Sequence, residues 1–190
     1  MHGLVEICDL DGTILLQKKN QLQYDWAAIA GKCIAVGDLN YRLRGMYLEY
    51  ENVAAPGSAA TLPDTSRSTT QAYYAGLNAV ANRDFLRLPF ATAPATTTDG
   101  AFTAHFAPHT GLGNIFTCAV ITTGVAGFHG KPFATAGVNS KIAGLALVAM
   151  PIENSQAADL IFARLPLAAP EQILFSAGAQ KLVRWHIAFQ

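Results

Sequence analysis

The chain has 190 residues, of which 51% are hydrophobic and 14% are charged, and its 13 basic and 13 acidic side chains cancel. Soluble domains usually carry about 25% charged residues, so this protein has unusually little charge for its surface. Zero net charge argues against direct nucleic-acid binding. The longest apolar stretch, residues 142–152, contains Pro151 and falls short of the roughly 20 residues of a membrane-spanning helix.

Low charge beside high apolar content indicates burial against other chains, because interfaces between identical subunits are more apolar than free surface. We therefore expect a homo-oligomer. The three cysteines, Cys8, Cys33 and Cys118, form no CxxC pair, which is typical of small buried residues in a reducing compartment. Residues 1–6 carry neither a basic leader nor an apolar signal core, so we expect folding in a cytoplasm.

Two short apolar runs open the chain, Leu4–Cys8 and Thr13–Leu16. The Asp-Leu-Asp-Gly stretch between them, residues 9–12, predicts a β-hairpin turn because glycine tolerates the positive φ that such turns require. The segment that follows, Gln17–Gln23, is polar.

A helix is predicted over Tyr24–Val36, with Asp25 as its N-cap and Gly37 as its stop. Its apolar face would hold Trp26, Ile29, Ala30 and Cys33. Met46–Tyr50 then predicts a strand. Asn52–Thr70 is rich in Ala, Pro, Gly, Ser and Thr and predicts a loop long enough to reach a neighbouring chain.

The middle of the chain mixes short strands and turns. Gln71–Val80 fits either a short helix or an extended connector. Phe85–Phe90 is strand-like, and Pro89 places it at a sheet edge or at a strand end. Ala91–Gly100, with Pro94 and three consecutive threonines, predicts turns.

The second half is richer in strand patterns. Ala101–Phe106 and Ile115–Thr122 are predicted strands, and the four glycines of Gly124–Asn139 predict a loop. Three strands close the chain: Ile142–Met150, Asp159–Leu167 and Leu182–Phe189. The last of them alternates, with Val183, Trp185, Ile187 and Phe189 on one face and Arg184, His186, Ala188 and Gln190 on the other.

Eight or nine short strands, one short N-terminal helix and many Gly/Pro turns predict a mainly β fold. Spacing of this kind indicates an antiparallel β-sandwich or a jelly-roll-like domain. We expect a single domain over residues 1–190. It would comprise a hairpin, a helix and a strand in 1–60, a long loop at 52–70 and the main sandwich strands in 82–190.

One motif suggests catalysis. Cys8–Thr13 resembles the first motif of haloacid-dehalogenase-like phosphatases, which implies Asp9 as nucleophile, Asp11 as general acid and Mg²⁺ between them. That chemistry also needs a lysine to neutralise the phosphoaspartate and further carboxylates to hold the metal. No downstream acidic pair has the required spacing. We therefore favour a hairpin turn, with a magnesium-dependent phosphatase as the weaker alternative.

Other chemically active residue types form no constellation in the sequence. The histidines are His2, His105, His109, His129 and His186. His105 and His109 are four apart, but Pro108 lies between them in a non-helical stretch, so no helical face can bring them to one metal. Gly111–Gly113 precedes a strand, unlike a nucleotide-binding loop. We predict no catalytic, cofactor or metal site, and no enzyme activity.

Aromatic residues offer a different class of function. The set comprises Trp26, Tyr41, Tyr47, Tyr50, Tyr73, Tyr74 and Trp185. Such side chains would stack on sugars in a glycan-binding β-sandwich, which is the alternative function. Aromatic residues at strand spacing are more often core or interface anchors, the interpretation we favour.

Three strand motifs carry a resemblance: Ala143-Gly-Leu145, Phe162-Ala-Arg-Leu-Pro166 and Val183–Phe189. Together they resemble the small β-sandwich module of tail-fibre, baseplate and adaptor proteins of tailed bacteriophages, best over residues 82–190. The resemblance implies a virion structural protein of the tail, collar, baseplate or head surface, assembled in the host cytoplasm. It implies a ring or trimer in contact with other virion proteins, and a host-surface glycan is a further candidate partner.

Overall fold

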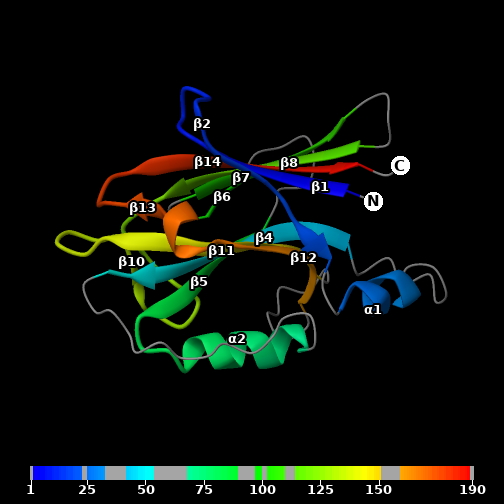
Figure 1. The fold of residues 1–190 in the computed structure, drawn as a ribbon, viewed down its shortest axis with the longest axis horizontal. Coiled ribbons are helices and arrows are strands. Elements are labelled where there is room, and N and C mark those ends of the chain that lie inside the picture. The colour runs from blue at the N-terminus through cyan, green and yellow to red at the C-terminus, as the bar shows by residue number, and fades with distance from the viewer. Residues whose placement is uncertain are drawn as a thin grey trace.

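The computed structural model describes residues 2–22, 25–32, 42–53, 68–89, 97–99, 102–109, 114–150 and 159–188. These residues form two antiparallel six-stranded sheets that pack face to face, together with a small two-stranded hairpin (Figure 1). The predicted mainly β fold is therefore confirmed.

The first sheet has the strand order β2-β1-β14-β8-β7-β6. Its strands are β1 (His2–Cys8), β2 (Ile14–Lys19), β6 (Thr97–Asp99), β7 (Phe102–His109), β8 (Asn114–Thr122) and β14 (Gln180–Ala188). The first and last strands of the chain are neighbours, with Val5 opposite Trp185. The C-terminal strand is thus held between β1 and β8, in the middle of this sheet.

The second sheet has the order β3-β12-β11-β4-β5, and β13 also pairs with β11. Its strands are β3 (Gln21–Leu22), β4 (Arg42–Asn52), β5 (Arg83–Pro89), β11 (Ser140–Met150), β12 (Leu160–Pro166) and β13 (Ile173–Phe175). Pro89 ends β5 at the edge of the sheet, as its missing N–H donor predicts.

Among the described residues, two helices and one 3₁₀ turn accompany the sheets: α1 (Trp26–Ala30), α2 (Thr70–Asn78) and η3 (Ala169–Glu171). The segment predicted as either helix or connector is therefore a helix. α2 lies along the outer side of the second sheet, away from the first sheet (Figure 1). The second sheet is consequently covered on both faces.

The predicted N-terminal helix exists, but with different bounds and a different role for Asp25. α1 begins at Trp26, while residues 33–36 and the expected stop at Gly37 lie outside the described residues. Asp25 occupies the N-cap position without bonding the helix through its side chain. Its carboxylate instead accepts the backbone N–H of Thr70 at 2.9 Å and the Thr70 hydroxyl at 2.5 Å. The carboxylate thus bonds to donors at the start of α2 instead of to N–H groups of α1, so Asp25 links the two helices.

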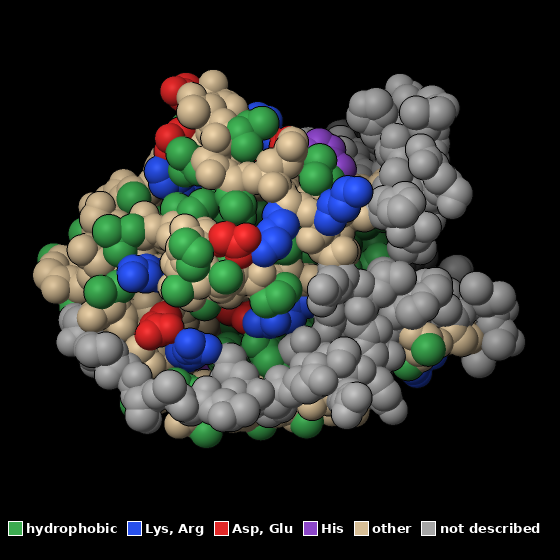
Figure 2. Space-filling view, in the orientation of Figure 1, with side chains coloured by type: hydrophobic (Ala, Val, Ile, Leu, Met, Phe, Trp, Pro, Cys, Tyr) green, Lys and Arg blue, Asp and Glu red, His purple; other side chains and the backbone are tan. Residues whose placement is uncertain are grey.

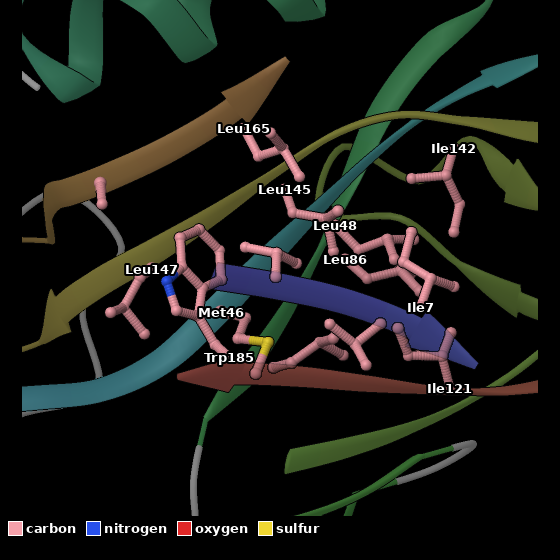
Figure 3. Packing of buried hydrophobic residues seen from close by; sticks show 14 of the residues in the cluster. Ile7, Met46, Leu48, Leu86, Ile121, Ile142, Leu145, Leu147, Leu165 and Trp185 are labelled. Carbon is pink, nitrogen blue, oxygen red and sulfur yellow. The ribbon is translucent and has the colours of Figure 1, made fainter. Parts of the chain in front are cut away.

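The main core lies between the sheets, where alternate residues of each strand point inward. Val183 and Trp185 are fully buried and Ile187 is 2% exposed, which confirms the alternation predicted for β14. Figure 3 shows Trp185 beside Met46 and Leu147 of the opposite sheet. Phe189 lies outside the described residues.

Short strands account for most of the differences from the sequence prediction. Thr97–Asp99 pairs with β7, although Ala91–Gly100 was expected to be turns. The glycine-rich Gly124–Asn139 segment contains a hairpin of β9 (Val125–Ala126) and β10 (Pro132–Phe133). Two- and three-residue strands are defined by backbone pairing with a neighbour, so no hydrophobic period reveals them.

Candidate functional site

The β1–β2 hairpin carries the two aspartates of the phosphatase-like motif. Its turn is closed by hydrogen bonds from Asp9 N to Thr13 O at 2.9 Å and from Gly12 N to Asp9 O at 3.0 Å. Gly12 has a φ of +92°, which favours glycine. The Asp11 carboxylate accepts the Thr13 N–H, which lowers the pKa of Asp11, and Asp9 pairs with Lys181 on β14. Both aspartates therefore stabilise the turn, and the predicted hairpin is confirmed.

The same hairpin exposes three large aliphatic side chains, which we call the aliphatic hairpin tip: Leu10, Ile14 and Leu15. They are 55%, 50% and 41% exposed, respectively. β2 is an edge strand, and the turn projects from the sandwich on the side opposite α2 (Figure 1). Because the turn is closed by its own hydrogen bonds and anchored through Lys181, these side chains are presented on a fixed support.

Glu49 on β4 is the centre of a buried polar cluster beneath α2. Arg164 donates to its carboxylate from Nε at 2.8 Å and from Nη2 at 2.5 Å, and the hydroxyls of Tyr73 and Tyr74 donate at 3.0 Å each. Burial by itself would raise the pKa of Glu49. The charge of Arg164 and these hydrogen bonds outweigh burial and hold the pKa below its usual value. With four donors on two oxygens, the carboxylate is fully engaged in joining α2 to the sheet.

Asp159, just before β12, forms a second polar cluster under the same helix. Arg87 donates to its carboxylate from Nε at 2.6 Å and from Nη2 at 2.9 Å, and the Tyr47 hydroxyl also donates to it. Burial and the charge of Asp159 raise the pKa of Tyr47, so that hydroxyl remains a donor. Gln71 on α2 donates to the Asp159 carbonyl oxygen at 2.8 Å. This cluster also fastens the helix to the sheet.

Asp84, on β5, is fully buried and organises the segment 127–131, which we call the clasp. Its carboxylate accepts the backbone N–H of His129 at 3.0 Å and of Lys131 at 3.1 Å, and it lies 2.9 Å from Nδ1 of the His129 ring. Lys131 Nζ donates at 2.7–2.8 Å to three carbonyl oxygens at the end of α2 and just beyond, those of Asn78, Val80 and Arg83. The clasp is therefore tied to β5 and α2 together.

The outer face of the first sheet carries a more exposed group around Glu6. Its carboxylate accepts from Gln17 Nε2 at 2.8 Å and lies 3.2 Å from His186 Nε2, with Arg184 Nη1 at 3.8 Å. Burial opposes ionisation of Glu6, but the Gln17 and His186 contacts and the nearby positive charge lower its pKa overall. His186 thus lies on the polar face of β14, as the alternation predicted, and its ring contacts the Glu6 carboxylate of β1.

Most of the aromatic residues considered for sugar stacking are core residues. Tyr47, Tyr50, Tyr73, Tyr74 and Trp185 are each no more than 1% exposed. They cannot present a ring face to a glycan, so the core interpretation is correct for these five. The side chains of Trp26 and Tyr41 lie outside the described part of the chain.

The structure describes only some of the side chains that bear on the predictions of buried cysteines and of no metal site. Cys8 is buried, and burial raises the pKa of its thiol; the side chains of Cys33, Cys118, His105 and His109 are not among those described. Across the residues that the structure describes, no three His, Cys, Asp or Glu side chains lie together as metal ligands.

The buried carboxylates Glu49, Asp84 and Asp159 were missed by the sequence reasoning. A signal was present for Glu49, because Glu49 and its partner Arg164 stand inside apolar strands, where an unpaired charge would be costly. Opposite charges within such strands indicate a buried pair. Asp159 precedes its strand and offered no comparable signal.

Comparison with known proteins supplies no relative: no family model, no curated protein and no solved structure matches the chain. In the described part of the chain, no helix has the length and apolar character needed to cross a membrane. Within the described residues, the buried carboxylates bond to neighbouring groups of the chain, whereas the aliphatic hairpin tip and Phe128 of the clasp expose apolar side chains to other molecules.

Proposed function

We propose that this protein is a structural subunit of a tailed-phage virion, in the tail, collar, baseplate or head surface. It would act by assembling with copies of itself and with other virion proteins, without catalysing a reaction. The phage assignment rests on the resemblance of the three strand motifs. The assembly role rests on surface charge and on the aliphatic hairpin tip.

The surface is poorer in charge than the composition suggests. Several of the 13 basic and 13 acidic residues are buried, namely Glu6, Asp25, Glu49, Asp84, Asp159 and Arg164. Others neutralise one another at the surface, such as Lys18 with Glu171 at 2.6 Å and Arg83 with Glu51 at 3.0 Å. Figure 2 shows acidic side chains next to basic ones on the visible face. A surface with few uncompensated charges does little to oppose association.

The aliphatic hairpin tip is the observation that carries the proposal. Three of the six large hydrophobic side chains exposed in the described part of the chain lie on this one hairpin, at its turn and at the start of β2. Apolar side chains held on a rigid projection can enter a partner's surface with little loss of conformational freedom. We therefore assign the β1–β2 hairpin as the principal assembly contact.

The test is the triple variant Leu10→Ser/Ile14→Ser/Leu15→Ser, examined by analytical ultracentrifugation over a range of protein concentrations. The wild-type chain should sediment as a defined oligomer. The triple variant should dissociate at protein concentrations at least ~10-fold higher than those at which the wild-type oligomer dissociates, because interface anchors each contribute more than about 1 kcal/mol. The three positions are exposed, so the variant should keep the wild-type circular dichroism spectrum.

Leu174→Ser is the matched control, because Leu174 is 50% exposed and lies on β13, a strand of the second sheet that is not part of the β1–β2 hairpin. Its sedimentation should match that of the wild type. An unchanged oligomer in the triple variant would rule out the hairpin as the contact. The phage assignment has its own test: mass spectrometry of purified particles from a producing host should detect this chain in stoichiometric amount, and its absence from them would end that assignment.

A further inference from the structure

Three aromatic rings form a stack that runs from the buried side of the second sheet to the surface. Tyr47 stacks on Phe85 at a centroid distance of 4.5 Å, and Phe85 stacks on Phe128 at 5.1 Å with an interplanar angle of 15°. Tyr47 and Phe85 are fully buried, whereas Phe128 is 46% exposed. One face of the Phe128 ring is therefore covered by Phe85, and the opposite face is the end of the stack.

The ring of His129 flanks this stack instead of covering its end. Its centroid lies 5.4 Å from that of Phe85 and 5.2 Å from that of Phe128, at interplanar angles of 77° and 88°. A ring at nearly equal distance from two parallel, stacked rings must stand beside both. His129 consequently leaves the outer face of Phe128 open and borders it with an upright imidazole.

The His129 imidazole has a fixed orientation and one ring nitrogen available to hydrogen-bond a ligand. Its Nδ1 lies 2.9 Å from the Asp84 carboxylate, which can only accept, so Nδ1 carries the hydrogen. Nε2 lies across the ring from that contact, and no described residue hydrogen-bonds to it. The His129 side chain is 23% exposed. A neutral imidazole in this tautomer accepts a hydrogen bond at Nε2.

The segment that presents both rings is rigidly held. Phe128 N donates to Phe85 O at 2.8 Å, Gly127 N to Lys131 O at 2.7 Å and Gly130 N to Gly127 O at 2.9 Å. The Asp84 carboxylate and the Lys131 ammonium fasten the same five residues to β5 and α2. An exposed aromatic ring on such a support is preorganised for contact.

We propose that Phe128 and His129 form a binding platform for a neutral pyranose sugar. The apolar face of a pyranose would stack on the open face of Phe128, and a ring hydroxyl would donate to Nε2 of His129. The size of the platform favours this ligand, because one partly exposed phenyl ring matches a single sugar ring, whereas a stable protein interface needs roughly 800 Å² from each partner. The site lies on the clasp, apart from the aliphatic hairpin tip, and it does not depend on the proposed assembly role.

The experiment is a titration of the ¹⁵N-labelled full chain with the methyl pyranosides of glucose, galactose, mannose and N-acetylglucosamine, followed by amide NMR. At least one of them should produce saturable shifts centred on residues 127–131. Phe128→Ala should abolish these shifts, and Phe128→Trp, which retains a flat ring, should preserve them. His129→Ala should weaken binding by roughly 2- to 10-fold, the loss expected for one hydrogen bond.

Leu174→Ala, at an equally exposed aliphatic position, should bind like the wild type. No saturable shift with any of the four sugars would overturn the proposal, and so would shifts that persist in Phe128→Ala. Adenosine is titrated in parallel. Shifts with adenosine alone would overturn the sugar proposal and identify a nucleobase as the ligand of the platform. A weaker oligomer for Phe128→Ala, without any sugar-dependent shift, would show that the ring is a protein contact.

Discussion

Arg164 forms a bidentate ion pair with the carboxylate of Glu49 beneath α2: its Nε lies 2.8 Å from Oε1 and its Nη2 lies 2.5 Å from Oε2. The Glu49 side chain is 1% exposed and that of Arg164 is 9% exposed. The pair thus exists in an environment where neither charge is tolerated without the other.

Replacing Glu49 with glutamine should lower the free energy of unfolding by about 3–5 kcal/mol, because the Arg164 charge would remain buried without its partner. Urea unfolding monitored by circular dichroism measures the change. The double variant Glu49→Leu/Arg164→Met, which removes both charges, should recover most of the loss. A single variant within about 0.5 kcal/mol of the wild type would show that the pair contributes little.

The same pair predicts how stability depends on pH. The folded-state pKa of Glu49 is below its ordinary value of 4.5, so the folded chain holds fewer protons than the unfolded chain between those two pKa values. This contribution to stability is complete above pH 4.5 and is lost as the pH falls through the folded-state pKa. Urea unfolding between pH 3 and pH 7 should show that decline, and Glu49→Gln should flatten it. An equal decline in both proteins would assign the acid sensitivity to other carboxylates, such as Glu6.

Position 127 in the clasp requires glycine, because the side chains of Tyr50 and Asp84 lie close to its backbone. A Cβ at this position would lie 2.3 Å from the Tyr50 hydroxyl and 2.4 Å from Asp84 Oδ2. Gly127→Ala should therefore destabilise the protein by about 1–3 kcal/mol, as overpacking of a filled site does. Gly31→Ala is the matched control, because a Cβ there meets nothing within 4 Å and the residue has α-helical φ and ψ. Thermal melting should separate the two variants, and equal melting temperatures would contradict the described packing.

Trp185 tests the packing between the sheets. Its side chain is fully buried in the main core, so Trp185→Ala should lower the free energy of unfolding by about 3–5 kcal/mol. The milder Trp185→Phe should remain soluble and lose less. Denaturant unfolding of both variants gives the comparison, and an alanine variant with wild-type stability would mean that β14 does not occupy the core.

The sequence predicted those parts of the fold that depend on local pattern. Alternation over Val183–Ile187 placed β14 correctly, and the Asp-Gly turn at Gly12 placed the first hairpin. It could not predict the Asp25–Thr70 contact or the tie between Asp84 and the clasp, because these join segments 45 residues apart in the chain. Phe128, within a glycine-rich segment, had no local signal to show that its ring would end a stack of buried aromatic residues. Tertiary packing decides which charges and rings are buried, and a single sequence contains little of that information.

The most direct test of the proposed assembly role is native mass spectrometry of the purified wild-type chain at micromolar concentration. We expect a closed oligomer, a ring or a trimer, that persists on dilution and dissociates when Leu10, Ile14 and Leu15 of the aliphatic hairpin tip are replaced by serine. A wild-type chain that stays monomeric throughout the concentration range would contradict it.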